Sequence, residues 1–396
     1  MKKAFHLAVL LLLGAVLISG CTGTDQTNTP AQTNFGQMLG DIPASYFDEN
    51  NLAYGAPGEA RELYGLGGIT SLEEYGETMQ EAYLEGLQGD SSMWKVNSVG
   101  GAVTPLRRFD IYKLDDILGI NFLNIDRAVY NAFPAPHTFA VYEGTFDSDL
   151  IQNKLIEQGY QETDYGDYSY FWKYDDFHQD LQSEIGNVLS NFNRITVTDS
   201  LLITAPSTGL MTGLLDAIGE ETPNLSELPS CRALADTLGD VLFATIMKRD
   251  NVPNPSSSKL VEDGFDLPAA RNWDPLHLYE AAAIAFRDDG NERFFDVALY
   301  YSSQTDAEAD ADNLASRLES YVFFTYNDPK DFTNLTDVFE VGEPVVKAYD
   351  GGATLTVSCR YRDDYNDKQG RFIPYFFALG SDLLFFAPDA VQYLTD

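Results

Sequence analysis

Carboxylates are the side chains in this sequence with the greatest capacity for chemistry. Two or more of them can do acid–base or glycosidic chemistry, but only at a defined separation in space. The loop Asp363–Gly370 (DDYNDKQG) also suits weak binding of a cation such as calcium through Asp363, Asp364 and Asp367, and the alternative interpretation is a solvated hairpin tip. Clusters after residue 140 lie at Asp164/Asp167, Asp175/Asp176, Asp288/Asp289 and Asp363/Asp364/Asp367.

A further acidic run, from Asp306 to Asp312, alternates like the oxygen ligands of a calcium loop. Ala311 stands where such a loop needs glycine, and helical periodicity begins at the same point. We therefore interpret these acids as the first turn of a helix, where negative charge favours the helix dipole.

Other residue types of catalytic interest lack partners at the required spacing. His137, His178 and His277 lie in different expected elements, which argues against a zinc site. No G-x-S-x-G sequence occurs, and the S-x-x-K pairs at Ser92/Lys95 and Ser256/Lys259 lack their companion motifs. The sequence therefore contains no recognised catalytic motif, and we lean towards a protein that is not an enzyme.

The segment Tyr165–Phe177 (YGDYSYFWKYDDF) interleaves aromatic and acidic side chains. Aromatic faces beside carboxylates can stack sugars or hold cations. Alternation along a strand instead predicts a packed strand, with Tyr168, Tyr170 and Trp172 on one face and Phe171 on the other. We favour the packed strand over the ligand platform.

Helices and hairpins alternate around these residues. Ser71, Asp147 and Ser207 are expected to cap helices, with those after Asp147 and Ser207 ending at Gly159 and Gly219. Further helices are expected at 177–192, at 230–238 and from Thr305 or Asp306. Strands are expected at 137–143, 160–165, 168–173, 195–197, 201–205, 241–247, 279–286, 294–301, 338–348, 353–361, 374–379 and 383–387.

The order of elements predicts an α+β fold with mainly antiparallel sheets and helices on one face. Residues 199–206 (DSLLITAP) are similar to residues 381–388 (SDLLFFAP), which indicates two related strand–helix–strand–strand units. The Pro- and Ser-rich stretch 251–264 is expected to link an N-terminal α+β domain at 42–250 to a C-terminal one at 265–396.

The N-terminus carries the most specific motif. Lys2-Lys3 precede an apolar run, and Ile18-Ser19-Gly20-Cys21 follows it. This resembles the lipobox of prokaryotic lipoproteins, although only over the first 21 residues. The resemblance implies a signal peptide at 1–20 and a lipid on Cys21. Residues 21–41 would then be a polar, flexible tether, and the folded part would lie outside the cytoplasm.

That compartment bears on Cys231 and Cys359, since extracytoplasmic thiols can pair. A disulfide would tie the middle of the chain to its end; two separate buried thiols are the alternative.

The net charge of the chain excludes one class of function. The 396 residues include 25 Lys plus Arg against 61 Asp plus Glu, a net charge of −36, which excludes a nucleic-acid binder because phosphate recognition needs a basic face. We expect a membrane-anchored, non-catalytic protein without a cofactor, which binds a ligand or envelope protein or has a structural role. The alternative is an exported carboxylate-dependent hydrolase, assisted by calcium.

Overall fold

The computed structural model describes residues 33–87, 111–133, 138–178, 191–252, 273–324, 332–362 and 386. These residues belong to one compact unit that begins at Thr33. The two domains and the linker expected at 251–264 are therefore not seen as separate bodies: β8 (Phe243–Lys248) pairs with β9 (Ala281–Asp288) across that stretch. Residues 253–264 themselves lie outside the described part.

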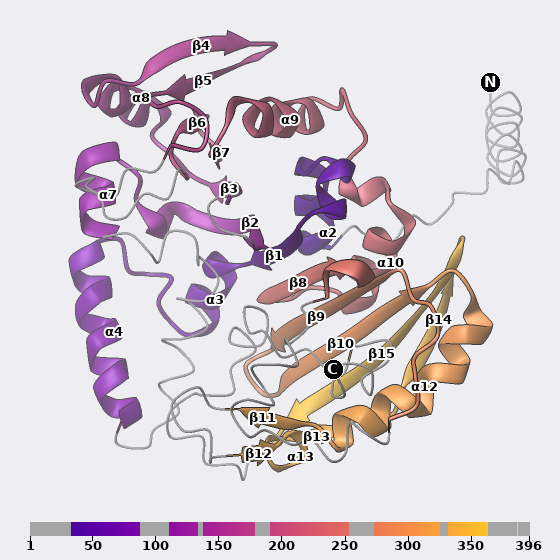
Figure 1. The fold of residues 1–396 in the computed structure, drawn as a ribbon. Helices are drawn as coiled ribbons and strands as arrows, with labels where there is room; N and C mark the ends of the chain where they lie inside the picture. The colour runs from indigo at the N-terminus through magenta and orange to yellow at the C-terminus, as the bar shows by residue number, and fades with distance from the viewer. Residues whose placement is uncertain are drawn as a thin grey trace, which may run out of the picture. The chain divides into compact units, whose positions relative to one another are not determined.

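Most of the described strands form a large antiparallel sheet (Figure 1). Its order is β13-β15-β10-β9-β8-β1-β2-β3-β7-β6-β5-β4, and β14 also pairs with β15. The two strands β11 and β12 form a separate pair. Further strand bounds are β1 Asn51–Gly55, β2 Ile125–Phe133, β3 Ala140–Gly144, β4 Gln161–Tyr165, β5 Tyr168–Trp172, β6 Arg194–Val197, β7 Leu201–Ala205, β10 Arg293–Tyr301, β11 Val322–Phe324, β12 Phe332–Asn334, β13 Phe339–Val341, β14 Val345–Tyr349 and β15 Gly352–Tyr361.

Both faces of the sheet are apolar because alternate residues of a strand point to opposite sides. In β10, Phe295, Val297 and Leu299 belong to one core cluster, whereas Ala298 and Tyr300 belong to the other. Two apolar faces need cover on both sides, so helices are required on each.

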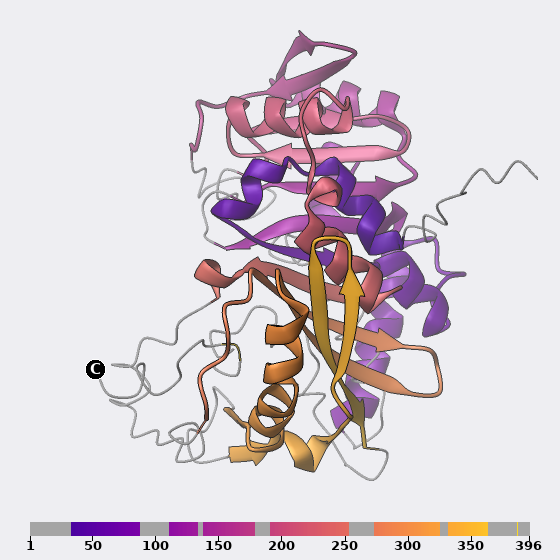
Figure 2. The same cartoon turned by 90° about the vertical axis from the view of Figure 1, so that its right-hand side faces the viewer.

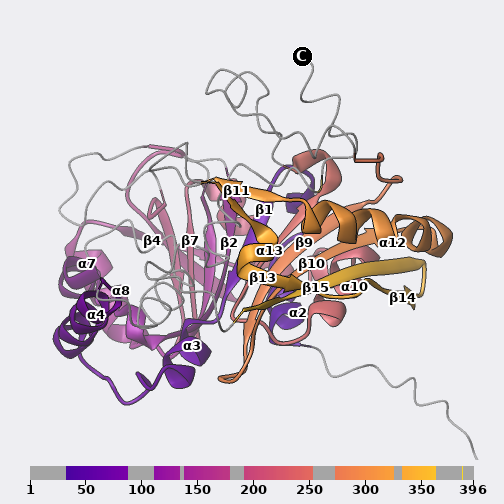
Figure 3. The ribbon, with the colours of Figure 1, turned by 90° about the horizontal axis from the view of Figure 1, so that it is seen from below.

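Helices do cover both faces, which corrects the expectation of helices on one face. Figures 2 and 3 show these layers from the side and from below. The first core cluster takes side chains from α4 (Leu72–Leu87), α7 (Ile111–Leu118), α8 (Ser148–Glu157) and α12 (Gln304–Glu319). The second takes them from α2 (Asn34–Met38), α9 (Thr208–Ile218) and α10 (Pro229–Leu238). Shorter helical elements are η1 Leu39–Asp41, η2 Ala44–Asp48, α3 Pro57–Leu63, η3 Phe122–Asn124, η4 Leu225–Glu227, η5 Arg249–Asn251 and α13 Leu335–Val338.

Several local expectations are confirmed. The side chains of Asp147 and Ser207 accept hydrogen bonds from the first turns of α8 and α9, and Gly219 ends α9. The hairpins β4–β5 and β6–β7 form as predicted. Helix α12 begins slightly earlier than expected because Ser303, rather than Thr305 or Asp306, is its N-cap.

The C-terminal part of the tether expected at 21–41 is instead folded. Residues 34–41 form α2 and η1, and Phe35, Met38 and Leu39 are completely buried against the second core cluster. Their apolar side chains supply burial energy that a polar tether lacks.

Cys231 and Cys359 are both buried, and both thiols are free. Cys231 lies on α10 in the second core cluster, and Cys359 lies on β15 in the first, on the opposite face of the sheet. The structure thus differs from the disulfide alternative and matches two separate buried thiols. Burial raises the pKa of the Cys231 thiol to about 12.

Candidate functional site

A cavity of about 770 Å³ lies beside α3, where β1 and β9 end and β2 and β8 begin. Figure 1 shows where α3 and these strands lie in the fold. At this end of the sheet Gly55, the last residue of β1, pairs with Phe243, the first of β8. We call it the Arg61 cavity. Its lining includes Asn34, Gly58, Glu59, Arg61, Glu62, Leu63, Gly67, Ile69, Leu123, Asp126, Arg127, Leu242 and Asp288.

Helix α3 brings its side chains to the cavity because it packs tightly on β2. Pro57 stands at the helix start, where its missing N–H costs nothing. Gly58 then meets β2: a Cβ there would lie 2.9 Å from Asp126 Oδ1 and 3.0 Å from its Cα. The absence of a side chain at Gly58 therefore sets how closely α3 approaches, and it places Glu59, Arg61 and Glu62 around the cavity.

Of the two arginines that line the cavity, Arg61 is the more deeply buried, and its hydrogen-bond partners are backbone carbonyl groups. Its side chain is 8% exposed, and Nη2 donates to the carbonyl oxygens of Leu123 and Ile125 at 2.8 and 2.9 Å. Asp126 lies 4.0 Å from Nη2. Nη1 is buried without a hydrogen-bond partner among the described residues. Burial lowers the pKa of Arg61, because desolvation penalises the charged form.

Arg127 also lines the cavity and is already paired with other protein groups. It forms an ion pair with Glu143 at 2.9 Å and donates to Gln37 at 3.1 Å and to Asn34 at 3.4 Å. The charges of Arg127 and Glu143 also act on Asp41. Burial, together with the charge of Glu143, raises the pKa of Asp41 to about 7.

The carboxylates of the cavity differ in how far the protein satisfies them. Asp288 is 2% exposed and accepts hydrogen bonds from Arg293, Tyr64 and the Gly290 N–H. One oxygen of Glu59 accepts from Asn34 Nδ2 at 2.6 Å, and burial raises the pKa of Glu59. Asp126 is 63% exposed. Unused acceptor capacity in the cavity thus lies mainly on Glu59, Glu62 and Asp126.

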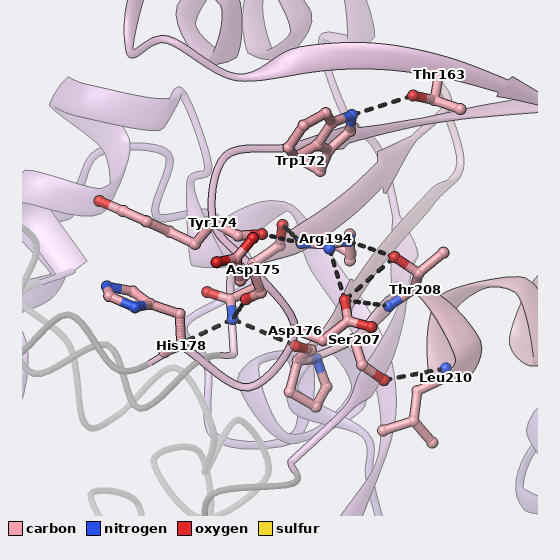
Figure 4. Close-up of polar contacts among 12 residues, drawn as sticks. Thr163, Trp172, Tyr174, Asp175, Asp176, His178, Arg194, Ser207, Thr208 and Leu210 are labelled. Atoms are coloured by element: carbon pink, nitrogen blue, oxygen red, sulfur yellow. Dashed lines mark hydrogen bonds and ion pairs between the residues drawn. The ribbon is translucent and has the colours of Figure 1, made fainter.

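The aromatic and acidic segment Tyr165–Phe177 is held by hydrogen bonds around Arg194, which we call the clamp around Arg194, and does not form an open platform (Figure 4). Arg194, whose side chain is 6% exposed, pairs with Asp176 at 2.6 Å and donates to Thr208 and to the Tyr174 carbonyl oxygen. Asp176 also accepts from the Thr208 N–H at the start of α9. The same loop is held from Asn193, whose amide donates to the backbone oxygens of Asp175, His178 and Pro206.

The predicted packing of β5 is therefore seen in the structure. Tyr168, Tyr170 and Trp172 pack on the second core cluster, and Phe171 belongs to the first. The Arg194 guanidinium lies 5.7 Å from the Trp172 ring, and Trp172 donates to Thr163. These contacts satisfy the groups that a ligand would have used.

His277 is held by a buried carboxylate. Asp310, 2% exposed, lies 2.7 Å from His277 Nδ1 and accepts from the His277 N–H and from the Tyr301 hydroxyl. The hydrogen bond with Asp310 raises the pKa of His277, and burial raises that of Tyr301. The sequence carried a signal for this pair: Asp310 stands one helical turn before Leu314 on the inner face of α12. From the sequence alone, we interpret Asp310 only as one of the acids that favour the helix dipole.

The remaining predicted site residues do not meet in one place. Cys21, His137, Asp363, Asp364 and Asp367 lie outside the described residues. Asp164, Asp167 and Asp175 are exposed, and Asp289 accepts from two N–H groups of its own turn. The Arg61 cavity was missed, because its residues come from sequence stretches that no motif connects.

In the described part of the chain, no group of three His, Cys, Asp or Glu side chains could hold a metal ion.

None of the described helices has the length and apolar character needed to span a bilayer.

Comparisons with known proteins give little further guidance. No known family matches the chain, and no curated protein is similar to it. Among solved structures, TP0453 in crystal form I aligns with a TM-score of 0.30 and 10% identity, covering 69% of this chain and 79% of that one. TP0453 in crystal form IV aligns with a TM-score of 0.31 and 12% identity, covering 75% and 92%. Likeness at this level supports no argument about fold or function, so the chain is placed in no family.

Proposed function

We propose that this protein is a lipid-anchored, extracytoplasmic binding protein and that the Arg61 cavity holds a small polar molecule. One observation carries the proposal: the cavity combines a buried guanidinium, carboxylates with unused acceptors, and an apolar wall of Leu63, Ile69, Leu123 and Leu242. Its volume falls within the range of about 300–1,000 Å³ typical of small-molecule sites, which join apolar walls to a few polar groups.

The anchor rests on the sequence. The lipobox-like Ile18-Ser19-Gly20-Cys21 supports acylation of Cys21, which would hold the acidic body at the outer surface of a membrane. Residues 22–32 would connect that lipid to α2.

A related proposal is that the sheet derives from two similar units. One pairs β1, β2, β3 and β7 in that order, with α8 following β3; the other pairs β8, β9, β10 and β15, with α12 following β10. Both helices lie on the same face, in the first core cluster. The Arg61 cavity takes Glu59 and Asp126 from the first unit, Leu242 from just before β8 and Asp288 from the end of β9 in the second, and ligand sites often occur at such junctions.

The anchor is tested by changing one thiol. Cells expressing the full chain should incorporate labelled lipid, and the protein should fractionate with membranes. Cys21→Ser should abolish the label and release the protein, whereas Cys231→Ser should retain both. Equal labelling of wild type and Cys21→Ser, or a cytosolic wild type, would contradict the anchor.

Binding is tested with the full chain in mild detergent and mixtures of amino acids, sugars, nucleosides, amines and organic acids. At least one mixture should raise the melting temperature, since a ligand at about 100 times its Kd stabilises by about 2.7 kcal/mol. Ile69→Trp, which places an indole in the cavity, should lose the shift. Val345→Trp, at an exposed position of β14, should keep it. No shift with any mixture would reject the binding function.

A further inference from the structure

We propose that the ligand of the Arg61 cavity is a small zwitterion, a free amino acid or dipeptide with an apolar side chain. Its carboxylate would meet Arg61, and its ammonium group would meet the carboxylates of Glu59 and Asp126. This inference rests on the proposed function of the cavity and adds the chemical class of its ligand.

Arg61 supplies the end that receives the carboxylate. Its side chain is more than nine-tenths buried and lines the cavity, and Nη1 has no hydrogen-bond partner among the described residues. A buried donor left unpaired costs about 1–3 kcal/mol, and a planar guanidinium is well matched to a carboxylate. Because Nη1 is covered in this structure, binding includes a turn of the guanidinium or a shift of a neighbouring side chain that uncovers it.

Arg127 does not compete for this role. Its ion pair with Glu143 and its bonds to Asn34 and Gln37 direct its guanidinium toward protein groups. Arg61, by contrast, is held on one side only, through Nη2 and two backbone carbonyls.

Glu59 and Asp126 supply the end that receives the ammonium group. Asn34 occupies one oxygen of Glu59, and Asp126 is 63% exposed at 4.0 Å from Arg61. Four carboxylates and two guanidinium groups line the cavity, so its net charge is negative. An anion alone would be repelled, whereas a molecule that adds an ammonium group is complementary to both ends.

The apolar wall accounts for the third part of the ligand. Leu63, Ile69, Leu123 and Leu242 line the same cavity, and Leu63 and Ile69 are only partly buried. An aliphatic side chain placed against them loses water-exposed surface, worth about 25 cal/mol per Å². The volume of about 770 Å³ is ample for one or two residues.

Calorimetry with the full chain in mild detergent tests the ligand class. The probes are L-leucine, leucylglycine, 3-methylbutylamine, which lacks the carboxylate, and 4-methylpentanoate, which lacks the ammonium group. Leucine or leucylglycine should bind, and each truncated probe should bind at least tenfold more weakly. A neutral sugar mixture serves as a fifth arm.

Variants assign the two ends. Arg61→Lys should weaken leucine binding at least tenfold and leave binding of 3-methylbutylamine unchanged. Asp126→Asn, which keeps the size of a 63% exposed side chain, should weaken leucine and amine binding but not that of 4-methylpentanoate. Arg249→Lys and Asp250→Asn, a partly exposed ion pair outside the cavity lining, are the matched controls and should change nothing.

The outcomes separate the ligand class from the binding function. If the amine binds as well as leucine, or Arg61→Lys binds leucine normally, the carboxylate assignment is wrong. If only sugars bind, and Ile69→Trp abolishes that binding, the cavity is a binding site and the zwitterion is rejected. If no probe binds while a metabolite mixture still stabilises the wild type, the zwitterion is again rejected and the binding function stands.

Discussion

Burial of a carboxyl group near Arg127 gives the protein a defined response to pH. The pKa of Asp41 is raised to about 7 in the folded state, chiefly by burial and then by Glu143. In the unfolded chain the pKa is close to 3.9. Between these values the unfolded state loses a proton that the folded state keeps, so stability falls as pH rises from about 4 to about 7 and is constant above.

Asp41→Asn should remove this loss. Relative to wild type, the variant should gain stability progressively from pH 4 to pH 7, reaching about 2–4 kcal/mol, because each pKa unit corresponds to 1.36 kcal/mol. Urea unfolding at a series of pH values measures the difference, with Asp167→Asn at an exposed hairpin tip as the control. A difference that is already complete at pH 4 would contradict the raised pKa.

The clamp around Arg194 makes a second prediction for a single residue. Its guanidinium contacts Asp176, Thr208 and the Tyr174 carbonyl oxygen, and a lysine ammonium cannot reach all of them (Figure 4). Arg194→Lys should therefore cost about 1–3 kcal/mol of stability, the scale for leaving buried hydrogen-bonding groups without partners. Arg360→Lys, which alters an exposed pair with Glu292 and Glu340, should cost under about 1 kcal/mol. Equal losses in urea unfolding would show that burial of Arg194 is unimportant.

The close packing of β3 on β2 leaves no space for a side chain at Gly144. At the end of β3, a Cβ on Gly144 would lie 1.9 Å from the Asn124 carbonyl oxygen and 3.1 Å from Ile125 Cα. Both contacts are with backbone, so the methyl group can be accommodated only by separating β3 from β2.

Gly144→Ala is accordingly expected to destabilise the protein by about 1–3 kcal/mol, the scale of overpacking. Gly209→Ala in the first turn of α9 is the matched control: nothing lies within 4 Å of a Cβ there, and alanine favours the helix by up to about 1 kcal/mol. Urea unfolding of the two variants should give opposite signs. Loss of stability in both would show that the methyl group itself, and not its surroundings, is responsible.

The edge strand β4 carries side chains that disfavour association with a second protein chain. Among the strands that the structure describes, β4 (Gln161–Tyr165) pairs only with β5, and three of its five residues are exposed: Gln161, Glu162 and Asp164. Charged side chains on an edge discourage pairing with a second chain. The sequence predicted β4 from its hairpin turn, but only the strand order identifies it as an edge.

The whole molecule is expected to unfold as one unit, since β8 and β9 join the two halves through six paired positions. Trp172 reports on one half and Trp273 on the other. With Trp94 replaced by Phe, single-tryptophan variants are made with Trp172→Phe or Trp273→Phe, and each variant should show the same urea midpoint by fluorescence as by far-UV circular dichroism. Coinciding midpoints indicate a single transition. Two separated midpoints would restore the two domains expected from the sequence.

The sequence by itself determined the local elements. Asp147 and Ser207 begin helices through bonds to N–H groups three residues away, and the alternation in β5 assigns Tyr170 and Phe171 to opposite faces. These signals are local, so they can be read without knowledge of the fold. The large negative charge likewise depends on composition alone.

Only the tertiary structure decided how those elements meet. Pairing of β8 with β9 joined the expected domains, and helices on both faces separated Cys231 from Cys359. It also brought Glu59 and Arg61 to Asp288, more than 200 positions away in the chain. Such contacts depend on burial and on strand order, which bring together residues that are far apart in the sequence. They therefore leave no periodic or spaced motif along the chain.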